Sequence, residues 1–186
     1  SIKFRRLRQL VYYVDGDVLT PVEFPFNSIQ FATGHATMDA KGAVYFVSNR
    51  PGSMIKSVVR DSSGRIVDTI YSSDIWKTTF DFDTEEWSNP VNLGDKVNTT
   101  EDELFPFIST WGNLYFSSYG WNSIGGLDVF VSKKNNDNSF SKPINLGSPV
   151  NTAYDDFAYV VNLETQEGYF SSNRPEGKGS DDIYKF

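Results

Sequence analysis

Short apolar runs of strand length, separated by clusters of Gly, Asn, Asp and Ser, recur along the whole chain. Residues 127–133 (L-D-V-F-V-S-K) carry apolar side chains on both alternating sets of positions, as strands covered on both faces require. Residues 44–47 (V-Y-F-V) form a similar run, and no segment has a helical period. The pattern therefore predicts an all-β fold of many short strands. Strands are expected at 9–14, 18–26, 35–39, 44–47, 105–109, 113–118, 127–133, 140–146, 156–162, 168–172 and 182–186.

These strands belong to an internal repeat. The phrase P-V-N-L-G at 90–94 returns as P-I-N-L-G at 143–147, and three aspartates, Asp74, Asp128 and Asp182, are spaced by 54 residues. A four-stranded repeat of about 50 residues with an aromatic pair and a Gly-rich turn is typical of a β-propeller blade. The sequence therefore predicts a β-propeller of four-stranded antiparallel blades, with the Tyr-Phe pairs in its core.

The repeat predicts that residues 1–186 are a partial propeller of about three and a half blades. Residues 1–26 would end a preceding blade, 27–93 and 94–146 would be full blades, and 147–186 would be a final, incomplete blade. Propellers use about four to eight blades. We therefore expect an open arc with apolar blade faces exposed at its ends. The other blades would lie upstream in the parent chain, be disordered, or come from another chain.

The first full blade contains an insertion. Tyr45 precedes Asp74 by 29 residues, whereas the equivalent aromatic residue precedes its aspartate by 13 in the other two repeats. The extra residues lie in 53–72, where two apolar runs flank the turn-forming sequence D-S-S-G at 61–64. This pattern predicts a β-hairpin inserted into a loop. Because surface insertions cost little stability and often carry function, we expect the hairpin to contact a partner.

Charge and composition exclude several classes of partner. The net charge of −7 and the isoelectric point near 4.7 argue against a nucleic-acid partner, and the basic cluster at 3–8 is interpreted as a solvated strand edge. No cysteine is present, which excludes disulfides. The sequence contains no apolar run of about 18 residues, so no transmembrane segment is predicted. The charged segment at the start is not followed by the apolar run of a signal peptide.

Three recurring motifs resemble a known family. N-L-G-x-x-V-N-T-x-x-D-(D/E), (L/G)-Y-F-S-S and S-N-R-P-x-G-x-G-x-D-D-I-Y resemble WD-repeat-like, TolB-type propeller repeats, over residues 21–186. More narrowly, they resemble the propeller segment of OmpA-family proteins of the Bacteroidetes, which include periplasmic components of type IX secretion and gliding motility. Two features depart from the pattern, namely the insertion at 53–72 and the sequence S-Y-G-W at 118–121 in place of S-N-R-P.

The resemblance implies a TolB-like propeller with six blades in the parent protein. It also implies a non-enzymatic scaffold that is periplasmic and associated with the outer membrane. Its partners would be other proteins of an outer-membrane or periplasmic assembly. Peptidoglycan would be bound only through an OmpA-like domain outside this chain.

The blade order predicts which loops gather at one end of the molecule, beside the inserted hairpin. We expect the residues of these loops to face a partner. They are Arg50, Asn98, Glu101, Asp102, Glu103, Asn151, Asp155, Asp156 and Arg174. The two arginines are expected to tie adjacent blades through carboxylate pairs. The three aspartates of the 54-residue spacing (Asp74, Asp128 and Asp182) are expected to cap turns by accepting backbone N–H bonds.

Two alternatives to a protein-binding scaffold stay open. The acidic loops at 101–103 and 155–156 offer oxygen ligands to a divalent cation such as calcium, although no EF-hand-like spacing is present and no metal or other cofactor is predicted. The same carboxylates would suit a propeller glycan-binding or glycosidase domain. Because they recur with the repeat, architecture explains them better, and no catalytic residue is predicted. His35, the single histidine, is interpreted as structural.

Overall fold

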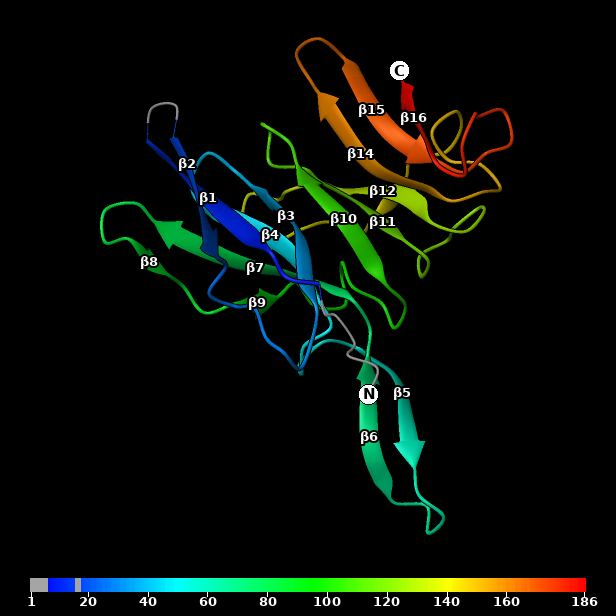
Figure 1. Ribbon diagram of the computed structural model, residues 1–186. Helices are drawn as coiled ribbons and strands as arrows, with labels where there is room; N and C mark the ends of the chain where they lie inside the picture. The colour runs from blue at the N-terminus through cyan, green and yellow to red at the C-terminus, as the bar shows by residue number, and fades with distance from the viewer. Residues whose placement is uncertain (1–6, 16–17) are drawn as a thin grey trace.

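The computed structural model describes residues 7–15 and 18–186 (Figure 1). Over these residues the chain is all-β, with sixteen strands in antiparallel sheets and no helix. Accordingly, no helix that could cross a membrane is found in the described part. Residues 16–17, between the first two expected strands, and most of the basic cluster at 3–8 lie outside the described residues. Arg8, the described member of that cluster, forms an ion pair with Glu23.

Three sheets follow one another along the chain, each ordered as its strands occur in the sequence. The first contains β3 (Thr33–Met38), β4 (Ala43–Ser48), β7 (Asp74–Asp81) and β8 (Glu86–Trp87), with β9 (Val91–Asn92) also paired to β7. The second contains β10 (Glu103–Ile108), β11 (Leu114–Ser118), β12 (Asp128–Ser132) and β13 (Ile144–Asn145). The third contains β14 (Asp156–Asn162), β15 (Glu167–Ser172) and β16 (Asp182–Lys185).

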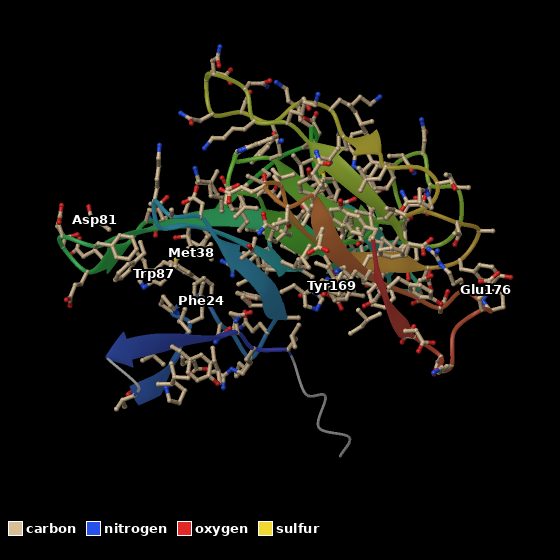
Figure 2. The ribbon with its side chains drawn as sticks, turned by 90° about the horizontal axis from the view of Figure 1, so that it is seen from above. Phe24, Met38, Asp81, Trp87, Tyr169 and Glu176 are labelled. Carbon is tan, nitrogen blue, oxygen red and sulfur yellow. The ribbon has the colours of Figure 1, made fainter. Side chains whose placement is uncertain are left out.

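Two further pairs of strands stand apart from these sheets. The pair β1 (Leu10–Asp15) and β2 (Val18–Glu23) lies against the first sheet, where Figure 2 shows Phe24 near Met38 and Trp87. The pair β5 (Ile55–Arg60) and β6 (Ile66–Tyr71) occupies the segment for which the sequence predicted an inserted hairpin. In Figure 1 this β5–β6 hairpin projects away from the rest of the molecule.

The first strands of the three sheets lie side by side, with β10 between β3 and β14 (Figure 1). Each pairing of such a strand with the next contains one register shift, between Gly34 and Thr37 in the first sheet and at equivalent places in the others. At these bulges His35, Phe105 and Ala158 have positive φ angles of 51°, 50° and 54°. The residue types differ although the backbone repeats, so the sequence gives no sign of the bulges.

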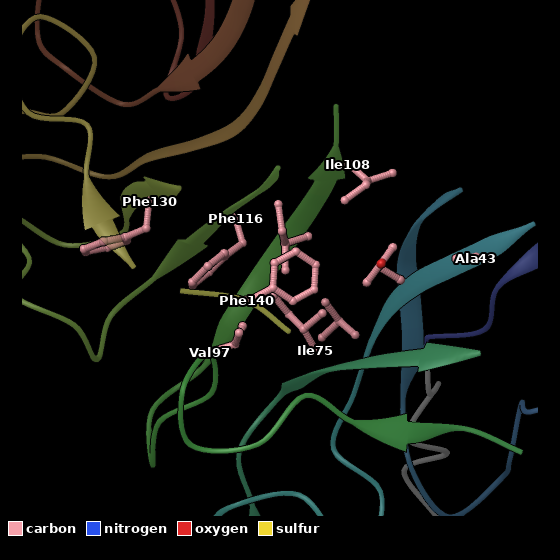
Figure 3. Close-up of a cluster of buried hydrophobic side chains, with 10 residues drawn as sticks. Ala43, Ile75, Val97, Ile108, Phe116, Phe130 and Phe140 are labelled. Atoms are coloured by element: carbon pink, nitrogen blue, oxygen red, sulfur yellow. The ribbon is translucent and has the colours of Figure 1, made fainter. Parts of the chain in front are cut away.

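Apolar side chains fill the spaces between consecutive sheets. One cluster, drawn in Figure 3, joins Ile75 of the first sheet to Phe116 and Phe130 of the second. Another joins Tyr115 of the second sheet to Tyr159 of the third. The central strands β4 and β11 are buried at every position. The first two sheets are therefore covered on both faces, as the sequence pattern predicted, whereas the central strand β15 of the third sheet alternates between exposed and buried positions. Burial of each large side chain contributes about 2 kcal/mol.

The structure corrects the expected strands in two places. The strand expected at 140–146 is reduced to the two residues of β13, because Pro143 has no N–H to donate, and Phe140 forms only an isolated bridge. Conversely, β8 was not expected. It follows a tight turn in which Asp81 Oδ1 accepts the N–H groups of Asp83 and Thr84 at 2.9 and 3.1 Å, and its acidic sequence does not read as a strand.

Candidate interaction surface

The side chain of Asn98 makes the hydrogen bonds to the backbone of β7 that a neighbouring strand would otherwise make. Its Oδ1 accepts the Ile75 N–H at 2.8 Å and its Nδ2 donates to Ile75 O at 3.0 Å. The same Nδ2 donates to Asn92 Oδ1 at 2.8 Å, and Asn92 Nδ2 donates to Asp74 Oδ2 at 2.7 Å. A carboxamide is suited to this place because it carries both an acceptor and two donors.

The second and third sheets are joined by a copy of this network. Asn151 accepts the Val129 N–H and donates to Val129 O, both at 2.8 Å, and it donates to Asn145 Oδ1 at 2.7 Å. Asn145 in turn donates to Asp128 Oδ2 at 2.7 Å. We call the two networks the asparagine clasps: Asn92, Asn98 and Asp74 form the first, and Asn145, Asn151 and Asp128 the second.

The asparagine clasps correct the expectation that Asn98 and Asn151 face a partner. The two residues are only 1% and 2% exposed. Their hydrogen-bonding groups are used by the backbone of the preceding sheet, since an unpaired buried strand edge would be costly. The recurring N-L-G-x-x-V-N motif is therefore explained by the joining of sheets.

The three equivalent aspartates all accept a backbone N–H near the start of a third strand. Asp74 accepts that of Met54 at 2.9 Å, Asp128 that of Ile124 at 2.6 Å, and Asp182 that of Gly179 at 2.8 Å. Burial raises the pKa of Asp74, although hydrogen bonds from Ser72 and Asn92 oppose this effect. Asp128 and Asp182 are thus local caps of the loop before their strand, whereas Asp74 makes the equivalent bond across the inserted hairpin.

Arg174 forms a buried ion pair within the third sheet. Its Nη2 lies 2.6 Å from Asp156 Oδ1 and also donates to Val150 O at 2.7 Å. The guanidinium packs over the rings of Phe170 and Tyr184, at 4.9 and 4.8 Å from their centroids. The expectation of a pair between adjacent blades is wrong, because both partners belong to the third sheet and its own loop. Asp156 is buried, so it does not face a partner either.

Arg50 occupies the equivalent place in the first sheet but has no carboxylate beside it among the described residues. It donates to Phe26 O at 3.0 Å and to Ser48 Oγ at 3.1 Å. Rings of Phe46 and other aromatic residues surround its guanidinium, and burial lowers the pKa of Arg50 to about 10. The expected carboxylate pair is wrong here because Thr33 stands where the third sheet has its aspartate. Arg50 is also buried rather than partner-facing.

Glu103 is the converse case, a buried carboxyl group with no salt bridge among the described residues. It accepts hydrogen bonds from Thr99 N at 2.9 Å, Thr99 Oγ1 at 2.7 Å and Ser118 Oγ at 2.8 Å. Burial raises the pKa of Glu103 to about 7 despite these three donors. The position of the arginine is taken by Gly120, where a Cβ would overlap the Thr99 hydroxyl. Glu103 therefore also leaves the set of partner-facing residues.

Asp102 and Asp155 are less buried, and each hydrogen-bonds to the preceding sheet. Asp102 Oδ1 accepts the Ser73 N–H at 2.8 Å, and Asp155 Oδ1 accepts the Leu127 N–H at 2.8 Å. Burial acts to raise the pKa of Asp102, but the hydrogen bonds from Ser73 and Lys56 outweigh it and lower that pKa. The two carboxylates are thus held by the architecture, although part of each reaches solvent.

The β5–β6 hairpin is tied to this loop by one lysine. Lys56 Nζ lies 2.9 Å from Asp102 Oδ2 and 3.1 Å from Glu101 Oε2. Beyond this anchor the hairpin presents apolar side chains to solvent, each between 43% and 54% exposed. They are Ile55, Val59, Ile66, Val67 and Ile70. Exposed apolar side chains gathered on a two-stranded sheet are a common feature of interaction surfaces.

A pocket lies at the bulges of the first strands of the three sheets. The ring of His35 stacks on that of Phe105, with centroids 4.2 Å apart and an angle of 15° between the planes. These residues and Tyr159 line a pocket of about 250 Å³. Burial lowers the pKa of His35, and its Nδ1 has no hydrogen-bond partner among the described residues. Sequence reasoning missed this pocket, because the bulges that form it carry different residue types and leave no local signal.

No group of three or more His, Asp or Glu side chains is placed to hold a metal ion within residues 7–15 and 18–186. Comparisons with protein-family models and with curated proteins find no match to this chain.

Proposed function

We propose that this chain forms consecutive blades of a TolB-like β-propeller, six-bladed in the parent protein, and acts as a non-catalytic protein-binding scaffold. Three observations support the propeller. The sheets repeat one strand order, their first strands lie side by side, and equivalent clasps join consecutive sheets. This arrangement is what radially stacked blades would require.

The β5–β6 hairpin is the proposed contact with the partner, and it is the observation that carries the functional proposal. It is the large departure of the first sheet from the repeat, and five of its apolar side chains remain 43–54% exposed. Lys56 fixes its base to Glu101 and Asp102. An apolar hairpin held at its base presents a preorganised surface, which lowers the entropic cost of binding.

The engagement of the recurring carboxylates supports a scaffold over a glycosidase. Asp102 and Asp155 accept backbone N–H groups of the preceding sheet. Glu103 and Asp156 are buried and accept hydrogen bonds from their own loops. Groups that hold the architecture in this way are poorly placed to act as an acid and a nucleophile on a glycan. A glycan-binding role is the second candidate, favoured by the aromatic pocket beside His35 and Tyr159.

The proposed location and partners rest on the sequence resemblance. The scaffold would be periplasmic and outer-membrane-associated, working with other proteins of type IX secretion or gliding machinery. Peptidoglycan would be reached only through a separate OmpA-like domain of the parent protein.

The proposal is tested by a paired substitution on the hairpin. Val59→Lys with Ile70→Lys should abolish capture of the partner in a crosslinking pull-down from cells that make the parent protein. The matched control, Ile144→Lys, changes an apolar residue of similar exposure elsewhere and should retain capture. Equal capture by both variants would contradict the proposed contact.

The non-catalytic assignment has its own test. Neither the unchanged chain nor its Asp102→Asn and Asp155→Asn variants should cleave any member of a panel of glycans. Cleavage by the unchanged chain that either substitution abolishes would instead establish the glycosidase. Binding without cleavage, lost on Phe105→Ala, would establish the glycan-binding candidate.

A further inference from the structure

The outer edge of β16 is unoccupied in the described structure, whereas the equivalent strands of the other two sheets are covered. In the first sheet, β9 pairs with β7, and in the second, β13 pairs with β12. In both sheets the covering strand begins directly after a proline. Its asparagine lies opposite a residue of the covered strand that comes two positions after the capping aspartate. The pairs are Asn92 with Trp76 and Asn145 with Phe130. The equivalent residue of β16 is Tyr184.

The capping aspartate of the third sheet lacks the partner that the covering strand supplies elsewhere. Asp74 and Asp128 each accept a hydrogen bond of 2.7 Å from the asparagine of that strand. Asp182 accepts one from Gly179 N, with no asparagine beside it among the described residues. Its carboxylate therefore has capacity for a further donor.

The backbone of Ile183 shows the same difference. Its equivalents Ile75 and Val129 are fully buried and bonded through N–H and C=O to a clasp asparagine. Ile183 is instead 76% exposed. In the antiparallel register with β15, Tyr184 faces Phe170 and Phe186 exchanges two hydrogen bonds with Gly168. The N–H and C=O of Ile183 therefore point to the open side.

We propose that this edge is a docking site for an extended peptide segment of the pattern Pro-(Val/Ile)-Asn-Leu-Gly-x-x-Val-Asn from outside these 186 residues. The two segments of this pattern within the chain, 90–98 and 143–151, are already committed to their own sheets. The proposal thus extends an interface that the molecule already contains twice. It does not depend on the partner proposed for the hairpin, because it concerns a different edge.

The docked segment follows the register of the two existing copies. Its first asparagine lies opposite Tyr184 and donates to Asp182, and its β-branched residue lies opposite Lys185. Its second asparagine bonds the N–H and C=O of Ile183. Backbone pairing supplies affinity, and the charge-assisted bond to the aspartate supplies selectivity for asparagine.

A synthetic peptide with the sequence of residues 139–153 tests the proposal in fluorescence anisotropy titrations with the 186-residue chain. We expect saturable binding, weakened at least about tenfold when the peptide carries Asn145→Ala and Asn151→Ala. Hydrogen exchange should show new protection at residues 182–186. Absence of saturation at about 1 mM peptide, which corresponds to only weak association, would overturn the proposal.

Two variants of the chain locate the binding. Ile183→Pro removes the outward N–H and is compatible with an edge strand, so it should abolish binding without unfolding the sheet, as circular dichroism would verify. Asp182→Asn should reduce the preference for asparagine in the peptide. Unchanged binding by Ile183→Pro, or protection at residues 128–132 through exchange with β13, would reject the site. A dimer in sedimentation that Ile183→Pro dissolves and the peptide does not would assign the edge to a second copy and overturn the proposed occupant.

Discussion

The second and third sheets begin with the same hydrogen-bonded arrangement around a buried carboxyl group. They differ in whether a cation lies beside that group. In both, a carboxyl group on the first strand accepts the N–H and hydroxyl of a threonine four residues earlier. In the third sheet Arg174 neutralises Asp156, whereas in the second the glycine at 120 leaves Glu103 without a cation and burial raises its pKa to about 7. The first sheet has the reverse, an arginine beside a threonine.

This comparison shows which part of the repeat is fixed by geometry. The carbonyl of the valine in the V-N-T motif is satisfied in both sheets, by Arg174 Nη2 at Val150 and by Trp121 Nε1 at Val97. Any donor of the right reach satisfies a carbonyl, so the donor type is free to vary. The charge of the neighbouring carboxyl group then depends on which donor is used.

The largest effect is expected from removing the cation of the third sheet. Arg174→Met leaves the Asp156 carboxylate buried and unpaired, which should lower the free energy of unfolding by about 3–5 kcal/mol in urea denaturation. The matched change in the first sheet, Arg50→Met, removes a cation that faces no carboxylate, so it should cost much less. Adding Asp156→Asn to Arg174→Met should restore part of the loss. Equal losses at the two arginines would refute the comparison.

A smaller, pH-dependent effect is expected at Glu103. Its folded pKa of about 7 lies above its ordinary value of 4.5, so the fold prefers the protonated form. This contribution to stability is complete below pH 4.5 and is lost as the pH rises through 7, to a total of about 3 kcal/mol at most. Glu103→Gln resembles the protonated form. It should match the unchanged chain near pH 4.5 and exceed its stability by about 1–3 kcal/mol at pH 8.

The control for this prediction is Asp156→Asn in the third sheet. That substitution removes the partner of Arg174, so it should destabilise the chain at both pH values. Comparing variants with the unchanged chain at each pH cancels the titration of His35, which is common to all. A Glu103→Gln variant that is less stable than the unchanged chain at pH 8 would show that the carboxylate is held in its charged form.

A smaller effect on stability is expected from adding a carboxylate beside the arginine of the first sheet. Thr33→Asp places a carboxylate in register with the third-sheet aspartate, beside a guanidinium that is already buried. We expect about 1 kcal/mol of stabilisation relative to Thr33→Asn, which has a similar shape and no charge, because the new attraction only partly exceeds the cost of burying a carboxylate. Thermal unfolding of both variants measures the difference. No advantage for the aspartate would mean that the ring-lined site already stabilises Arg50 fully.

The sequence predicted the all-β class and most strand positions because alternation and turn residues are local signals. The segment 156–162, for example, coincides with β14. The sequence did not predict the burial of Glu103 and Asn98, because acidic and amide residues in loops normally face solvent and only tertiary contacts show otherwise. The bulges at His35 and Phe105 were equally hidden, since a positive φ at a bulky residue is imposed by the surrounding sheet.

The smallest effect on stability is expected where the first sheet departs most from the other two. Replacing residues 55–71 by two glycines removes the hairpin but keeps Met54 and Ser72, whose contacts with Asp74 define the start of β7. What is lost is one lysine anchored to Glu101 and Asp102 in a partly exposed ion pair, which contributes about 0–1 kcal/mol. Most of the other hairpin side chains are exposed, although Ile70 and Tyr71 line a hollow together with Phe31. The melting temperature should therefore change by only a few degrees while partner capture is lost.

Lys56→Ala, as a control, should show the stability part of this change alone. A loss of several kcal/mol on deletion would show instead that the hairpin is part of the fold.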